Sequence, residues 1–89
     1  MATIAFTSQL QRFTSTPQLD TPAATLRGAL DAAFALNPRL RGYVLDDQGG
    51  LRPHVVVYID GKRSLDRAAQ SDALAESSRV FVLQALSGG

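Results

Sequence analysis

The sequence predicts one small α+β domain, in which a single main helix packs on one face of a mixed sheet of four or five strands. Three observations predict it. One segment repeats apolar residues at helical spacing, another is an unbroken apolar strand, and 89 residues leave room for one domain only. Hydrophobic residues make up 45% of the chain, which is enough for a modest core and too many for a disordered chain.

Charge and cysteine content exclude several classes of function. Nine basic residues against eight acidic ones leave a net charge of +1, which argues against nucleic acid or an anionic membrane as partner. The absence of cysteine excludes disulfides, thiolate metal sites and a cysteine nucleophile. The first ten residues lack a signal-peptide pattern, and no apolar run approaches the ~18 residues of a membrane span, so we expect a cytoplasmic protein. We also expect it to be a monomer when free.

The first elements are expected to be two strands. Residues 3–6 form a short β-type run, and residues 12–16 return beside it as a hairpin. Pro17 confines the end of the second strand to an edge or a turn, because proline lacks the N–H that a central ladder needs.

The next element is the helix, which is expected to end at Leu36 because Asn37 precedes Pro38. Thr25 is favoured as its N-cap, and Thr21 followed by Pro22 is the alternative start. One stripe is apolar at three- and four-residue steps and consists of Leu26, Ala29, Leu30, Ala33 and Phe34.

The rest of the chain supplies the remaining strands. Residues 39–52 are predicted to be a loop with a turn at 46–50, and Val55–Ile59 is the clearest strand. Asp60-Gly61 forms a tight turn into a short returning strand at 62–65. A polar stretch at 66–78 contains a short helical turn, and the last strand covers 80–83 and continues towards 85. We expect the first and last strands to lie side by side and parallel.

The sequence ends in Ser87-Gly88-Gly89, almost directly after the last strand. Small residues at a chain end are commonly an unstructured tail without function. Glycine has no Cβ, however, so this segment can thread a narrow cleft in a partner enzyme. We therefore expect a domain over residues 1–86 and a flexible tail over 87–89 that presents a main-chain carboxylate.

The order of the predicted elements, together with several short motifs, resembles the ubiquitin-like β-grasp sulfur carriers of the ThiS/MoaD type over nearly the whole chain. The matching segments are Thr25-Leu26 at the helix start, Pro38-Arg39-Leu40-Arg41 after the helix, the strand and turn from Val55 to Gly61, and the final Gly-Gly. Residues 46–52 look most like the branch that serves cysteine biosynthesis and related thiocarboxylate pathways. The chain departs from the family at residues 74–80, where Ser77 replaces a usual turn glycine.

The resemblance implies a protein that is no enzyme itself and binds no cofactor. An adenylating, ubiquitin-activating-like enzyme would use ATP and Mg²⁺ to convert the Gly89 carboxylate to an acyl adenylate, while Ser87 and Gly88 thread into that enzyme. Sulfur would then displace AMP and leave a Gly89 thiocarboxylate for an acceptor biosynthetic enzyme. Because the chain has no cysteine, the sulfur must come from a separate donor.

Two other functions stay open. A ubiquitin-like modifier would use the same adenylation and end in an isopeptide bond, although Lys62 is the only lysine, which argues against chain building on itself. A noncatalytic β-grasp interaction module would leave the tail incidental.

A partner needs a recognition surface, and strand alternation predicts one. Val56, Tyr58, Phe81 and Leu83 would face away from the helix and form an apolar contact patch. The alternative is that the 39–52 loop buries Phe81 and Leu83. Arg63 and Arg79 could help orient a partner. His54 is the only histidine and has no second ligand at metal-site spacing, so no metal site is expected.

Overall fold

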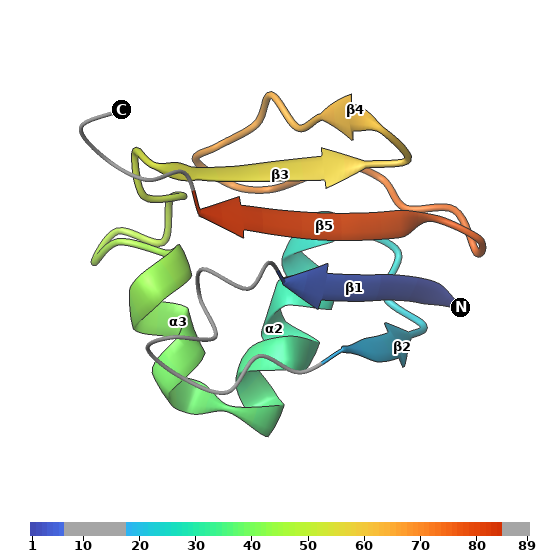
Figure 1. Ribbon diagram of the computed structural model, residues 1–89, viewed down its shortest axis with the longest axis horizontal. Coiled ribbons are helices and arrows are strands. Elements are labelled where there is room, and N and C mark those ends of the chain that lie inside the picture. Colours follow the sequence, from blue (N-terminus) through green and yellow to red (C-terminus); the bar gives the residue numbers. More distant parts are fainter. Residues whose placement is uncertain (7–17, 85–89) are drawn as a thin grey trace.

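The computed structural model describes residues 1–6 and 18–84, apart from the side chain of Gln84. Five strands form one sheet in the order β2-β1-β5-β3-β4, and two helices lie on the same side of it (Figure 1). The strands are β1 (Ala2–Phe6), β2 (Leu19–Thr21), β3 (Val55–Ile59), β4 (Lys62–Arg63) and β5 (Arg79–Gln84). The helices are α2 (Leu26–Leu36) and α3 (Pro38–Val44).

The first and last strands pair in parallel at the centre of the sheet, which confirms the expected arrangement. Ile4 lies opposite Val80, and Phe6 lies opposite Val82. β3 runs antiparallel to β5, and β2 runs antiparallel to β1. Parallel strands cannot be joined by a tight turn, so both helices and the other strands lie between β1 and β5 along the chain.

Strand boundaries differ from the expectation by a residue or two. β1 begins one residue earlier than predicted, β4 is shorter than 62–65, and β5 covers 79–84. The strand predicted at residues 12–16 lies outside the described residues. Among the described residues, the antiparallel partner of β1 is β2, which follows Pro17.

Helix α2 forms as the sequence predicts. The Thr25 hydroxyl accepts a hydrogen bond from the Gly28 N–H at 3.2 Å, which identifies Thr25 as the N-cap. The five residues of the predicted apolar stripe are the buried residues of the helix. Asn37 ends it in an extended conformation, as expected of a residue before proline.

The prediction of a loop directly after Asn37 is wrong, because a second, shorter helix follows the main helix α2. Pro38 begins helix α3, because the first helical position needs no N–H and suits the fixed φ of proline. The Asn37 side chain accepts a hydrogen bond from the Arg39 N–H at 3.3 Å and so caps the new helix. Leu40 and Val44, four residues apart, are fully buried. Asn37 therefore ends one helix and begins the next.

Both predicted turns are confirmed. The Asp46 carboxylate accepts hydrogen bonds from the Gln48 and Gly50 N–H groups, and Gly49 has φ +85°. At the end of β3, Asp60 and Gly61 have φ +52° and +81°. Asparagine, aspartate and glycine tolerate this left-handed region better than other residues.

Gln70 ties together three segments that are far apart in the sequence. Its side chain is completely buried, and its Nε2 donates to the carbonyl oxygens of Gly49 at 3.2 Å and Arg67 at 2.6 Å. Its Oε1 accepts from Arg27 of α2 at 3.1 Å. The short helical turn expected in this region is one turn, closed by the Gln70 N–H and the Asp66 carbonyl.

We predict that Gln70→Ala lowers the free energy of unfolding by about 2 kcal/mol, because buried carbonyl and guanidinium groups lose their partner. Denaturant unfolding measures this change. Gln48→Ala is the matched control, since Gln48 is exposed, and should change stability by less than about 0.5 kcal/mol. Equal effects of the two substitutions would contradict the assigned role of Gln70.

The Asp66 carboxyl is expected to contribute to the pH dependence of folding stability at acidic pH. The hydrogen bond from the Ser71 hydroxyl, followed by those from the Ser71 and Ala69 N–H groups, lowers the pKa of the Asp66 carboxyl below its ordinary value. A carboxyl whose pKa is lower in the folded chain stabilises the fold above its unfolded pKa and loses that effect as the pH falls through the folded pKa. Asp66→Asn should therefore flatten the decline in melting temperature below about pH 4. An unchanged decline would contradict this contribution.

Candidate functional site

The candidate site is the face of the sheet that points away from the helices, called the outer face below. Side chains alternate along each strand, so Val55, Val57, Val80 and Val82 are buried on the helix side. Ile59, on the same side, is partly buried and packs against the core. In Figure 1, α2 crosses behind β5 and β1, so the outer face is turned towards the viewer.

The four predicted patch residues meet on this face as two cross-strand pairs. Tyr58 lies opposite Phe81, and Val56 lies opposite Leu83. Phe81 is 49% exposed and Tyr58 36%, while Val56 and Leu83 are half-buried. The alternative that a loop buries Phe81 is therefore wrong. We call these four residues the outer-face patch, and its binding of a partner stays a prediction.

A hollow of about 340 Å³ adjoins the patch and was not predicted from the sequence. It exists because β1 presents only the small side chains of Thr3 and Ala5 on the outer face, next to the large Phe81 on β5. Polar groups of Asp20 and Arg79 also line it. Small residues at alternate positions of an otherwise β-type run were the sequence signal for this feature.

The predicted tail residues Ser87, Gly88 and Gly89 lie outside the described residues, so their role stays a prediction. What the structure describes is the strand that leads to them. β5 has hydrogen-bonded neighbours on both sides, and its last residue, Gln84, lies opposite Val55 at the start of β3. β5 is therefore a central strand of the sheet, although among the described residues its last two residues, Leu83 and Gln84, pair only with β3.

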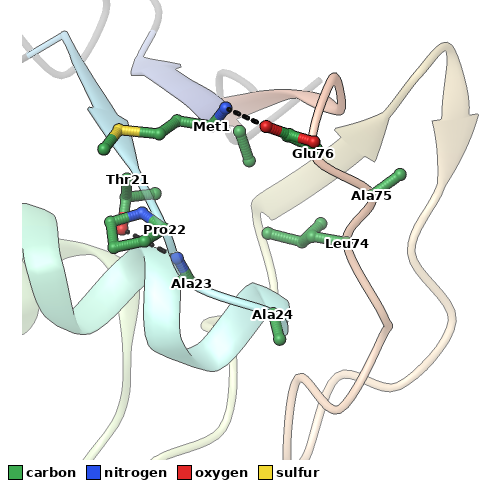
Figure 2. Close-up of a pocket in the computed structure, with 9 residues that line it drawn as sticks. Met1, Thr21, Pro22, Ala23, Ala24, Leu74, Ala75 and Glu76 are labelled. Atoms are coloured by element: carbon green, nitrogen blue, oxygen red, sulfur yellow. Dashed lines mark hydrogen bonds and ion pairs between the residues drawn. The ribbon is translucent and has the colours of Figure 1, made fainter.

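A second hollow, of about 320 Å³, lies at the beginning of β1. Figure 2 shows Met1 and Glu76 on one side and Pro22, Ala23 and Leu74 on the others. The Met1 amino group and Glu76 carboxylate lie 4.0 Å apart, and their side chains are 62% and 95% exposed, so this ion pair contributes little.

The remaining chemistry-bearing groups form no constellation in the described ranges. His54 is exposed directly before β3. Among residues 1–6 and 18–84 no three histidine, aspartate or glutamate side chains gather as metal ligands. Neither α2 nor α3 has the length and apolar character of a membrane span.

No protein-family model matches the chain, and no curated protein matches it in sequence. Solved structures do match it over most of their length. A crystal structure of SAMP1 from Haloferax volcanii is 26% identical, covers 99% of this chain and 98% of its own, and has a TM-score of 0.77. The fold is the ubiquitin-like β-grasp.

Two further structures from the same organism agree on the β-grasp. A second crystal structure, of small archaeal modifier protein 1, is 23% identical with a TM-score of 0.74 and covers 96% of this chain and 97% of its own. The solution structure of the HVO 2177 protein is 24% identical with a TM-score of 0.67 and covers 99% of this chain and 85% of its own. The resemblance to β-grasp proteins is thus confirmed, whereas the cysteine-biosynthesis branch stays a prediction.

Adjacent residues of β5 provide a test of the two faces. Phe81→Asp should change the free energy of unfolding by about 1 kcal/mol or less, because Phe81 is half exposed and loses mainly its pairing with Tyr58. Val82→Asp should cost about 4 kcal/mol or more, because it buries an unpaired carboxylate. Denaturant unfolding measures both. Similar losses would show that Phe81 has a structural role and would remove it from the patch.

Proposed function

We propose that this chain is a ubiquitin-like carrier protein whose Gly89 carboxylate is activated by an adenylating enzyme and converted to a thiocarboxylate. The observation that carries the proposal is the match to SAMP1 over 99% of this chain and 98% of that chain, together with Gly88-Gly89 in the sequence shortly after the end of β5 at Gln84. The protein would be a substrate of other enzymes and not a catalyst.

The proposed chemistry follows from the poor reactivity of a carboxylate. Attack of the Gly89 carboxylate on the α-phosphorus of Mg²⁺-bound ATP forms an acyl adenylate and releases pyrophosphate. A sulfide or persulfide sulfur from a separate donor then attacks the acyl carbon, and the C–O bond to AMP breaks. Reduction of the remaining S–S bond by a thiol completes the step when the donor is a persulfide. The product is a thiocarboxylate, a soft nucleophile held on a protein.

The outer-face patch would hold the chain on the adenylating enzyme. A carboxylate on a short glycine segment reaches a remote active site only when the domain behind it is docked in a fixed orientation. The Tyr58–Phe81 pair supplies exposed aromatic area on a rigid sheet, and aromatic residues are enriched at the centres of protein interfaces. Ser87 and Gly88 would span the distance to the bound ATP.

Conjugation to a target lysine is the second candidate function. The name of small archaeal modifier protein 1 says that the structural neighbour is a modifier. Both functions share the acyl adenylate and differ only in the nucleophile that displaces AMP. Lys62 is exposed and is the only lysine through which copies of this chain could be linked by an isopeptide bond.

Intact mass spectrometry tests the proposal. After incubation with the adenylating enzyme from the same genome, ATP, Mg²⁺ and sulfide, the mass of the chain should rise by about 16 Da, the difference between sulfur and oxygen. Untreated protein must first have the mass of a chain that ends in a free Gly89 carboxylate.

Removal of Gly89 is the variant for this experiment, and Gln48→Ala is its control because Gln48 is exposed. The truncated chain should gain no mass, and the control should react like the wild type. Conjugates without a thiocarboxylate would establish the modifier function instead. No mass change with the wild-type chain would overturn activation at Gly89.

A further inference from the structure

Acidic and basic side chains, which almost balance in number, differ in how many of them make hydrogen bonds or ion pairs within the chain. Seven of the eight carboxylates make a hydrogen bond or ion pair within the described residues, and Asp47 does not. The seven are Asp20, Asp31, Asp46, Asp60, Asp66, Asp72 and Glu76. Most of these hydrogen bonds come from neutral N–H and hydroxyl donors, so the carboxylates keep their charge while their oxygen atoms are occupied within the chain.

Five cationic side chains of the described ranges, in contrast, make no hydrogen bond or ion pair there. They are Arg39, Arg41, Lys62, Arg63 and Arg79, and all five are exposed. The other described cations, Arg27, Arg52 and Arg67, donate to partners within the chain. The unengaged cations are thus free to pair with groups on another molecule.

Two of the unengaged cations stand beside the outer-face patch. Arg63 of β4 lies opposite Tyr58, so its side chain is on the same face as that ring. Arg79 lies two residues before Phe81 on β5 and borders the hollow above Thr3 and Ala5. The Tyr58–Phe81 pair therefore has a free guanidinium on each of two sides.

The carboxylates nearest to this pair of rings already have partners. Asp20 accepts from the Thr3 hydroxyl at 2.8 Å, and Asp60 accepts from the Arg79 N–H at 2.9 Å. Neither carboxylate forms an ion pair with the Arg63 or Arg79 guanidinium. The guanidinium N–H groups of Arg63 and Arg79 would therefore lack acceptors if this face were covered, and acidic groups of a partner would be the strongest acceptors for them.

We propose that the outer face binds a protein surface with an apolar centre and two acidic groups, one for Arg63 and one for Arg79. Under the proposed function this surface belongs to the adenylating enzyme, and the inference rests on that function. The bidentate geometry of a guanidinium with a carboxylate would fix the orientation of the domain as well as add affinity. The hollow beside Phe81 leaves room for a side chain of the partner.

Charge reversal with a matched neighbour tests this inference. The double variant Arg63→Glu/Arg79→Glu should bind the purified adenylating enzyme from the same genome about tenfold or more weakly than the wild type. Lys62→Glu/Arg39→Glu is the control, because it changes the net charge equally. Lys62 is paired with Ile59, on the opposite side of the sheet from Arg63, and Arg39 is on α3. The control should lose less than about threefold.

Titration calorimetry at low and high salt measures the affinities, and circular dichroism checks that all variants are folded. Wild-type affinity should fall with salt, and the affinity of the double variant should depend on salt much less or in the opposite sense. If both double variants lose the same affinity for the adenylating enzyme, the loss is explained by the change in net charge, and the inference of two acidic groups facing Arg63 and Arg79 is overturned. Full activation of Gly89 with unchanged affinity in the double variant would overturn it while leaving the proposed function intact. If the wild-type chain is not activated at all, both proposals fall.

Discussion

The parallel pairing of β1 with β5 is the constraint on which the rest of the structure depends. It brings together the two ends of the described chain, with Ile4 opposite Val80 at the centre of the sheet. Every other element must then fit within one crossover, and α2 and α3 cover the face on which Ile4, Val80 and Val82 are buried. The same pairing leaves Phe81 on the other face and makes β5, the last described strand before Gly88-Gly89 in the sequence, a central strand of the sheet.

The two faces of the sheet differ because side chains alternate between them along β5. Val80 and Val82 hold the strand to the core, whereas Arg79, Phe81 and Leu83 are presented outward by the same backbone. Under the proposed function, this arrangement would let a partner enzyme recognise the outer face, because pairing on both sides holds Arg79 and Phe81 in place within the sheet.

Sequence reasoning succeeded where local rules act alone. Thr25 as N-cap, the apolar stripe of α2 and the Asp60-Gly61 turn depend on neighbouring residues, and each was predicted correctly. It failed at Pro38, which was treated only as the end of one helix although it also begins another. The hollow beside Phe81 and the engagement of the carboxylates depend on register between distant strands, and a single sequence does not contain that register.

The central claim is that partners recognise the outer face of β3 and β5 when they act on the chain end. An NMR titration of the ¹⁵N-labelled chain with the adenylating enzyme tests it most directly, since each backbone amide reports its own contact. We expect the amide signals of β5 and β3 to shift or broaden first, while those of α2 respond least. Changes centred on α2, with β3 and β5 unaffected, would contradict it.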